Sequence, residues 1–152
     1  MKLTDRLRVE HGVYLLQLRH VEELLKCEAA PEAVAAALST IVVAEDHHSR
    51  LEDAVLYPEL ERLVGAAAPP LVEVRQTHAR LQVLATQARL SASPADVRAF
   101  VNALREHMEQ EIHHVFPLIE ELISEELLAS LGNWQEDHIR HELGRPERWA
   151  PS

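Results

Sequence analysis

Apolar residues recur at helical spacing along four long segments of the chain, and short stretches rich in Pro, Gly, Ala and Ser separate these segments. The stretches that break the pattern lie near Pro31, at 65–70 and at 91–94. Ser93 is placed to cap the fourth segment, with Pro94 in its first turn. We therefore expect helices over 3–27, 31–64, 71–90 and 94–123.

Short connections between long helices favour antiparallel neighbours. The fold class predicted is therefore all-α, an antiparallel up-down-up-down four-helix bundle formed by residues 1–123. Residues 124–143 carry a further helical pattern, and two prolines follow Gly144. We expect 124–152 to form a short C-terminal helix and a tail that pack on the same domain.

The chain contains an internal repeat. Residues 48–61 read HSRLEDAVLYPELE and residues 107–120 read HMEQEIHHVFPLIE, and the two align without a gap. Each copy falls on the second helix of a helical hairpin, so the chain consists of two related halves. The shared prolines, Pro58 and Pro117, predict either a helix end or a kink at each place.

Charged residues interrupt the apolar stripe of both repeated helices. His48 and Glu52 are four residues apart, as are His107 and Glu111, and this spacing puts each pair on one helix face. Charged groups on a buried stripe are costly unless they are paired or bound to a metal ion.

The other two helices each add one histidine to their apolar stripe. His11 lies between Leu7 and Leu15, and His78 lies between Val74 and Leu81. One such histidine alone is usually a core residue with a satisfied hydrogen bond. Four histidines and two glutamates, one set on each helix, favour a shared metal site instead.

The donor types narrow the choice of metal. Imidazole and carboxylate without thiolate suit iron, manganese or zinc. If each glutamate bridges two ions, each ion has about four protein donors. An ion that prefers six donors then keeps about two positions open for an oxo or hydroxo bridge and an external ligand.

Charge and composition limit the partners. The formal net charge is −10, which disfavours nucleic-acid binding. The apolar runs are too short to cross a membrane, and the N-terminus has no apolar signal segment. The single cysteine, Cys27, suits a reducing compartment, so we expect a cytoplasmic protein.

We expect the other residues near the apolar stripes to contribute less to a metal site, or not at all. We expect His20, His47 and His113 to lie off the ligand face. His114, three residues after Glu111, is a candidate for an extra ligand or an outer partner, and Glu45 is expected to be a solvated carboxylate. Tyr57 is expected to fill the core.

The single His, His-x-x-x-Glu, single His, His-x-x-x-Glu pattern over about residues 5–122 resembles the hemerythrin-like family of HHE cation-binding domains. The LYPELE and VFPLIE segments are also similar to that family. The resemblance implies a non-haem di-iron centre within a four-helix bundle, with Glu52 and Glu111 as bridging ligands. By position it implies these metal ligands: His11, His48, Glu52, His78, His107 and Glu111.

One departure from the family pattern affects the expected function. Respiratory hemerythrins have a fifth histidine one turn before the position of His78, where this chain has Val74. The chain is more similar to the members with four histidines and two glutamates, which include iron-repair proteins, nitric-oxide-handling proteins and iron sensors. Reversible oxygen carriage is therefore not the function expected.

The leading hypothesis is a protein with two iron ions that binds or reacts with O2, NO or peroxide. The alternative is an iron or oxygen sensor, or an iron-handling protein, without turnover. A third is a helical scaffold without metal. The sequence leaves open whether the chain is an enzyme and which protein partner it has.

Overall fold

The computed structural model describes the backbone of residues 1–143 and the side chains of residues 1–134. The predicted tail from Gly144, and the side chains of His138 and His141, lie outside the described residues. All regular structure within 1–143 is helical, so the all-α class is confirmed. The elements are α1 (Leu3–Lys26), α2 (Pro31–Leu51), η1 (Glu52–Leu56), α3 (Tyr57–Val64), α4 (Pro69–Ser91), α5 (Pro94–Gln110), η2 (Glu111–Val115), α6 (Phe116–Leu122) and α7 (Glu125–Leu143).

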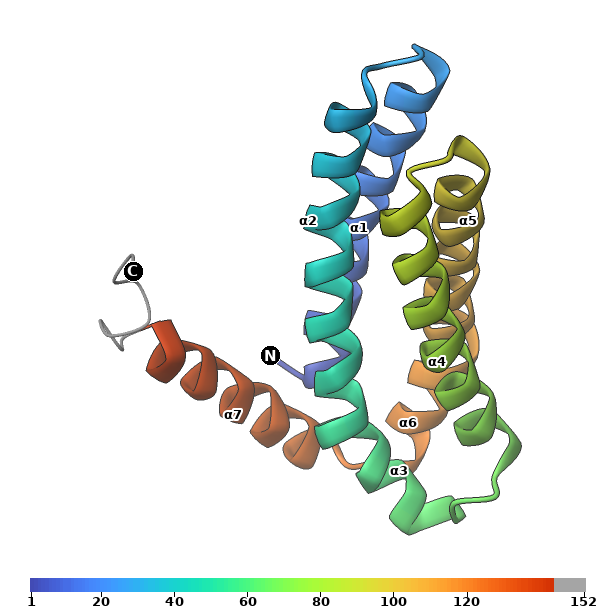
Figure 1. The fold of residues 1–152 in the computed structure, drawn as a ribbon. Coiled ribbons are helices and arrows are strands. Elements are labelled where there is room, and N and C mark those ends of the chain that lie inside the picture. Colours follow the sequence, from blue (N-terminus) through green and yellow to red (C-terminus); the bar gives the residue numbers. More distant parts are fainter. Residues whose placement is uncertain (144–152) are drawn as a thin grey trace.

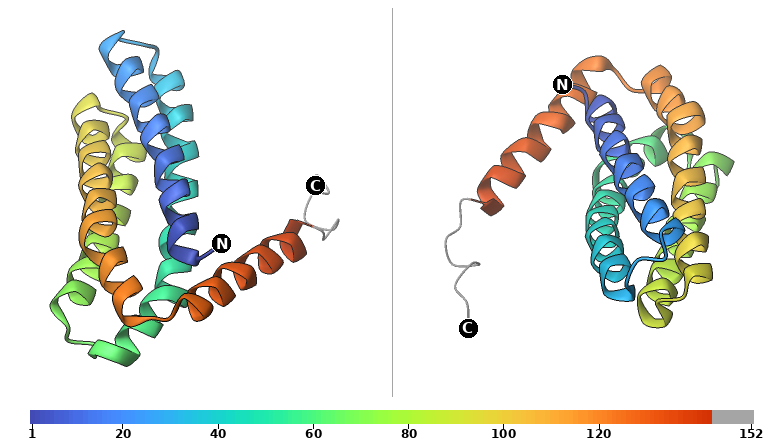
Figure 2. Two further views of the ribbon diagram at one scale, coloured as in Figure 1. Left: turned by 180° about the vertical axis from the view of Figure 1, so that it is seen from behind. Right: turned by 90° about the horizontal axis from the view of Figure 1, so that it is seen from above.

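The long helices lie side by side (Figures 1 and 2). α1 packs on α2, α4 packs on α5, and further contacts join α2 to α4 and α1 to α5. This arrangement is consistent with the expected four-helix bundle. None of the helices within the described range is both long and apolar enough to cross a membrane.

Local sequence explains where the helices begin. Pro31, Pro69 and Pro94 lie in the first turns of α2, α4 and α5, where a missing N–H costs no hydrogen bond. The Ser93 hydroxyl accepts a hydrogen bond from the Asp96 amide at 3.2 Å, which confirms the predicted N-cap.

The chain stays helical through both repeated prolines. A single wide π turn, η1 or η2, precedes each of them, so neither proline ends its helix. The amides of Tyr57 and Phe116 bond to the carbonyls of Glu52 and Glu111, five residues back. Proline follows directly, where an ordinary helix would lose a hydrogen bond and suffer a clash. Each π turn therefore begins at a predicted ligand glutamate.

Two apolar clusters lie on opposite sides of a buried polar layer. Along α1, Leu3 and Leu7 belong to one cluster, while Leu18 and Val21 belong to the other, with His11 between them. The other long helices follow the same order. The buried polar residues include all four predicted ligand histidines and both glutamates, so the expected inner stripe is confirmed as buried.

The two halves correspond beyond the repeated segments. When His11 of α1 is aligned with His78 of α4, every other buried position except Leu3 of α1 also matches. The matched pairs are Thr4 with Leu71, Leu7 with Val74, Tyr14 with Leu81, Leu18 with Ala85, and Val21 with Ala88. The internal repeat therefore covers both helices of each hairpin.

The C-terminal helix α7 has 19 residues and corresponds closely to the helical pattern expected over 124–143. Its first turns contact the start of α1, and Leu128 is buried in the apolar cluster there. Gly132 lies close to the Met1 carbonyl. Beyond that contact α7 runs away from the other helices (Figures 1 and 2). That 124–152 belongs to the same domain stays a prediction.

Candidate metal centre

The six residues predicted as ligands meet in the polar layer between the apolar clusters. Each is at most 3% exposed. They form two overlapping groups whose donor atoms are close enough to hold a metal ion, and both glutamates belong to both groups. The first group also has His11 and His48, and the second has His78 and His107.

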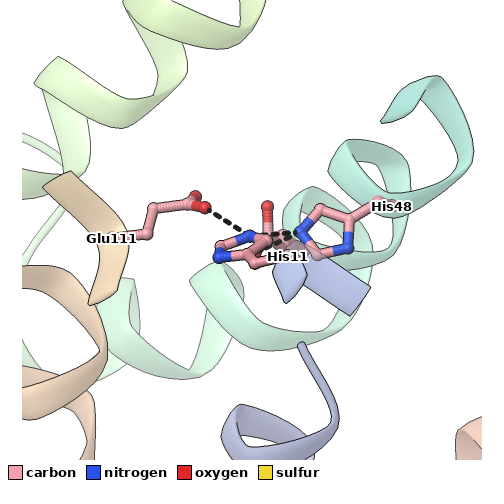
Figure 3. A group of neighbouring side chains, drawn as sticks. His11, His48 and Glu111 are labelled. Atoms are coloured by element: carbon pink, nitrogen blue, oxygen red, sulfur yellow. Dashed lines mark hydrogen bonds and ion pairs between the residues drawn. The ribbon is translucent and has the colours of Figure 1, made fainter. Parts of the chain in front are cut away.

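The donors of the first group come from α1, α2, η1 and η2. The Nε2 atoms of His11 and His48 are 3.0 Å apart. Glu111 Oε2 lies 3.2 Å from His11 Nε2, and Glu52 Oε1 lies 3.2 Å from His48 Nε2. Figure 3 shows His11 between His48 and Glu111, with its ring nitrogen facing both.

The second group has the same form on α4 and α5. The Nε2 atoms of His78 and His107 are again 3.0 Å apart. Glu111 Oε1 lies 3.2 Å from His107 Nε2, and Glu52 Oε2 lies 3.4 Å from His78 Nε2. Each glutamate therefore directs one oxygen to each histidine pair.

These spacings fit metal coordination. Two donors at about 2.1 Å from one ion, and at a right angle, would lie about 3.0 Å apart. Three of the glutamate oxygens, both of Glu52 and Oε2 of Glu111, accept no hydrogen bond although they are buried. Buried carboxylate oxygens without hydrogen bonds are costly, and a cation removes that cost. The donor set suits iron, manganese or zinc.

Carboxylates hold the outer edges of two of the four imidazoles. His48 Nδ1 lies 2.7 Å from Glu10 Oε2, and His78 Nδ1 lies 3.1 Å from both oxygens of Asp53. Such partners fix the ring and the tautomer of a metal-binding histidine, so that Nε2 points to the ion. Within the described part of the chain, the Nδ1 atoms of His11 and His107 have no hydrogen-bond partner.

Equivalent aromatic residues of the two halves make different contacts at the centre. The Tyr57 hydroxyl donates a hydrogen bond to Glu111 Oε1. Phe116, at the same repeat position, has no hydroxyl and stacks on His11 with ring centroids 5.5 Å apart. Tyr57 fills the core as expected, and it also makes a hydrogen bond that the sequence did not predict.

The facing carboxylates raise the pKa values of His48 and His78 in the metal-free protein. Burial lowers the pKa of His48, but the charge of Glu52 and the bond to Glu10 outweigh it and raise the pKa to about 10. Burial likewise lowers the pKa of His78, but the facing carboxylates of Asp53, Glu111 and Glu52 outweigh burial and raise it to about 12. Burial raises the pKa of Glu111, but the nearby histidines, His107 first, bring it well below its usual value.

One expectation about the neighbouring residues is wrong, and the candidate role of His114 as a ligand is not supported. Glu45 is buried, not solvated; it accepts a hydrogen bond from Ser49, and burial raises its pKa. His114 is exposed. The wide η2 turn carries more residues per revolution, so three residues past Glu111 the chain has not returned to the inner face.

The sequence reasoning missed the outer partners Glu10 and Asp53. Each directly adjoins a predicted ligand in the sequence, Glu10 before His11 and Asp53 after Glu52. Each contacts the histidine of a different helix, which single-helix periodicity does not show. Their only sequence signal was a second acid beside an inward ligand.

The family model of the hemerythrin HHE cation binding domain matches residues 2–119. The match spans all six converging residues and most of the chain. A search of curated proteins and a search of solved structures found no match. From the matched residues and the buried histidine and glutamate groups, the chain belongs to the hemerythrin family of HHE cation-binding domains.

Proposed function

We propose that the six buried residues bind two iron ions, and that the resulting non-haem di-iron centre binds or reacts with O2, NO or peroxide. The observation that carries the proposal is the position of the two glutamates. Each directs one oxygen to the first histidine pair and the other oxygen to the second pair. That arrangement fits two ions bridged by two carboxylates.

The chain itself would orient and isolate the centre. Glu10 and Asp53 hold the outer nitrogens of His48 and His78, which leaves their Nε2 lone pairs for the ions. The Tyr57 hydroxyl holds one glutamate oxygen. The apolar clusters on both sides keep water away. The bound iron would supply electrons and open coordination positions for a small ligand.

The direct test is metal content after anaerobic reconstitution with ferrous iron. We expect two ions per chain in the unaltered protein. Glu52→Ala and Glu111→Ala should each lose both ions, because each removes a donor from both groups. His20→Ala, which changes an exposed histidine of α1, is the matched control and should keep both. Full-affinity binding in both glutamate variants would contradict the bridging arrangement.

Reactivity separates the proposed function from its alternative. The reduced protein is exposed to O2, NO or peroxide, and the optical spectrum and product formation are followed. A rapid spectral change supports a ligand-binding or reactive centre.

The alternative is an iron or oxygen sensor, or an iron-handling protein, without turnover. Because the ligands come from four separate helical segments, metal binding would order the whole fold. Tight binding with a large rise in melting temperature, but without reaction, would favour this alternative.

A further inference from the structure

The two halves differ beside the second histidine pair. Glu10 directly precedes His11, and Thr77 directly precedes His78, so the two occupy equivalent positions. Glu10 holds the outer nitrogen of His48 at 2.7 Å. The Thr77 hydroxyl is too short for that role and donates to the Glu73 carbonyl at 2.9 Å. His107, the equivalent of His48, therefore has no partner on Nδ1 although it is 2% exposed.

A cavity of about 640 Å³ lies beside this position. It lies between α4 and the α5–η2 segment, and both His107 and Thr77 line it. The Nε2 atom of His107 faces His78 and Glu111, while Nδ1 lies on the opposite side of the ring and is buried. His107 thus joins the buried centre to a space that opens to solvent.

The cavity wall is acidic and carries metal-binding side chains. Its carboxylates are Glu73, Glu106 and Glu109, against one cation, Arg80. The exposed imidazoles of His113 and His114 also line it. A concave surface with net negative charge concentrates cations, and carboxylate with imidazole suits divalent transition metals.

The other ligand histidines each contact a side chain outside the two donor groups. Carboxylates hold His48 and His78, and Phe116 stacks on His11. Apolar clusters cover the centre on both sides. Of the four ligand histidines, His107 is the one that lines this cavity, and none of the described residues is a hydrogen-bond partner of its Nδ1 atom.

We propose that this cavity is the uptake and release route for the divalent cations of the centre. The wall carboxylates and imidazoles collect the ion, and rotation of the His107 ring passes it to the buried donors. The proposal rests on the proposed function, because it requires that the six buried residues bind metal.

The first test measures uptake of Co(II) by the metal-free protein in stopped-flow absorbance at low salt. The triple variant Glu73→Gln, Glu106→Gln, Glu109→Gln should take up Co(II) about fivefold more slowly. The control variant removes three exposed acids elsewhere and has the same net charge: Glu32→Gln, Glu121→Gln and Glu126→Gln. It should slow uptake less than twofold, and high salt should abolish the difference. Equal slowing in both variants would overturn the proposal.

The second test measures release of Co(II) to an excess of chelator. Thr77→Glu restores a carboxylate beside His107 and should slow release at least tenfold, because the ring is then held. Thr77→Gln, of the same size without the charge, should slow release less. Release as fast as in the unaltered protein in both variants would overturn the proposal. Failure of the unaltered protein to bind Co(II) at all would instead contradict the proposed metal centre itself.

Discussion

Tyr57 is a residue whose role depends on a single hydroxyl. Its bond to Glu111 is buried and involves a charged acceptor, and burial keeps the pKa of Tyr57 well above its usual value. Hydrogen bonds of this kind contribute about 1.5–3 kcal/mol. We expect Tyr57→Phe to lower the free energy of unfolding of the metal-free protein by about 2 kcal/mol in urea titrations.

Tyr14→Phe is the matched control for that variant. The Tyr14 hydroxyl donates to the neutral carbonyl of Ala44 at 3.1 Å, so its loss should cost about 1 kcal/mol. Tyr57→Phe should also change the optical spectrum of the metal-loaded protein, while Tyr14→Phe should not. Equal effects of the two substitutions on stability and spectrum would contradict a larger contribution from the Tyr57–Glu111 hydrogen bond.

Among the elements, α7 depends on a close contact at one glycine. A Cβ on Gly132 would overlap the Met1 carbonyl oxygen and lie 3.2 Å from the Leu3 amide nitrogen. Because both obstacles are backbone, α7 would have to move. We expect Gly132→Ala to lower the free energy of unfolding by about 1–3 kcal/mol, measured by thermal and urea unfolding.

Gly12 gives the opposite expectation for the same substitution. It lies exposed within α1, and a Cβ there would meet nothing within 4 Å. Gly12→Ala should raise the free energy of unfolding by about 0.5–1 kcal/mol, because alanine favours the helix. It should leave metal content unchanged, although it adjoins His11. Destabilisation by Gly12→Ala would mean that α1 packs more closely than the structure indicates.

Helix positions could be predicted from the sequence, but the π turns could not. The expected helix over 94–123 corresponds closely to α5, η2 and α6, which end at Leu122. A π turn adds one residue to a helical turn. Over only five residues this addition does not disturb the apolar pattern from which helices are predicted. It does change the direction of the side chains that follow, and for that reason His114 is exposed and does not share the inner face with Glu111.

At the scale of the whole molecule, the metal-free protein should lose stability as pH rises. His48 and His78 have pKa values of about 10 and about 12 when folded, above 6.5 for free imidazole. The contribution of these two histidines to the free energy of unfolding is complete below pH 6.5. It is lost as pH rises through their pKa values in the folded state. We expect the melting temperature of the metal-free protein to fall between pH 6.5 and about 10.

Metal loading should change this pH dependence. An imidazole that holds an ion has given up its Nε2 proton, so binding at pH 7 should release protons from His48 and His78. Metal affinity should therefore rise with pH, and the loaded protein should lose less stability above pH 7. Calorimetric titration in buffers of different ionisation enthalpy counts the protons. Binding without proton release would show that neither imidazole is protonated in the metal-free state.

The convergence of the six residues could be predicted because each lies on the apolar stripe of its own helix. Burial on one stripe is a property of local sequence. The partners of those six could not be predicted, because they depend on how helices are rotated against each other. Asp53 shows the difference: its side chain is 43% exposed, as a surface acid would be, yet it contacts His78 of another helix.

The exchange of glutamates between the halves has a consequence for the origin of the fold. Each hairpin contributes both histidines of one donor group and one glutamate. That glutamate directs one of its oxygens to the histidines of the other hairpin. Two copies of a single hairpin, related by a twofold axis, would therefore already contain every donor. The chain corresponds to such a homodimer joined end to end, and Glu10, Asp53 and Tyr57 mark where its two copies have ceased to be interchangeable.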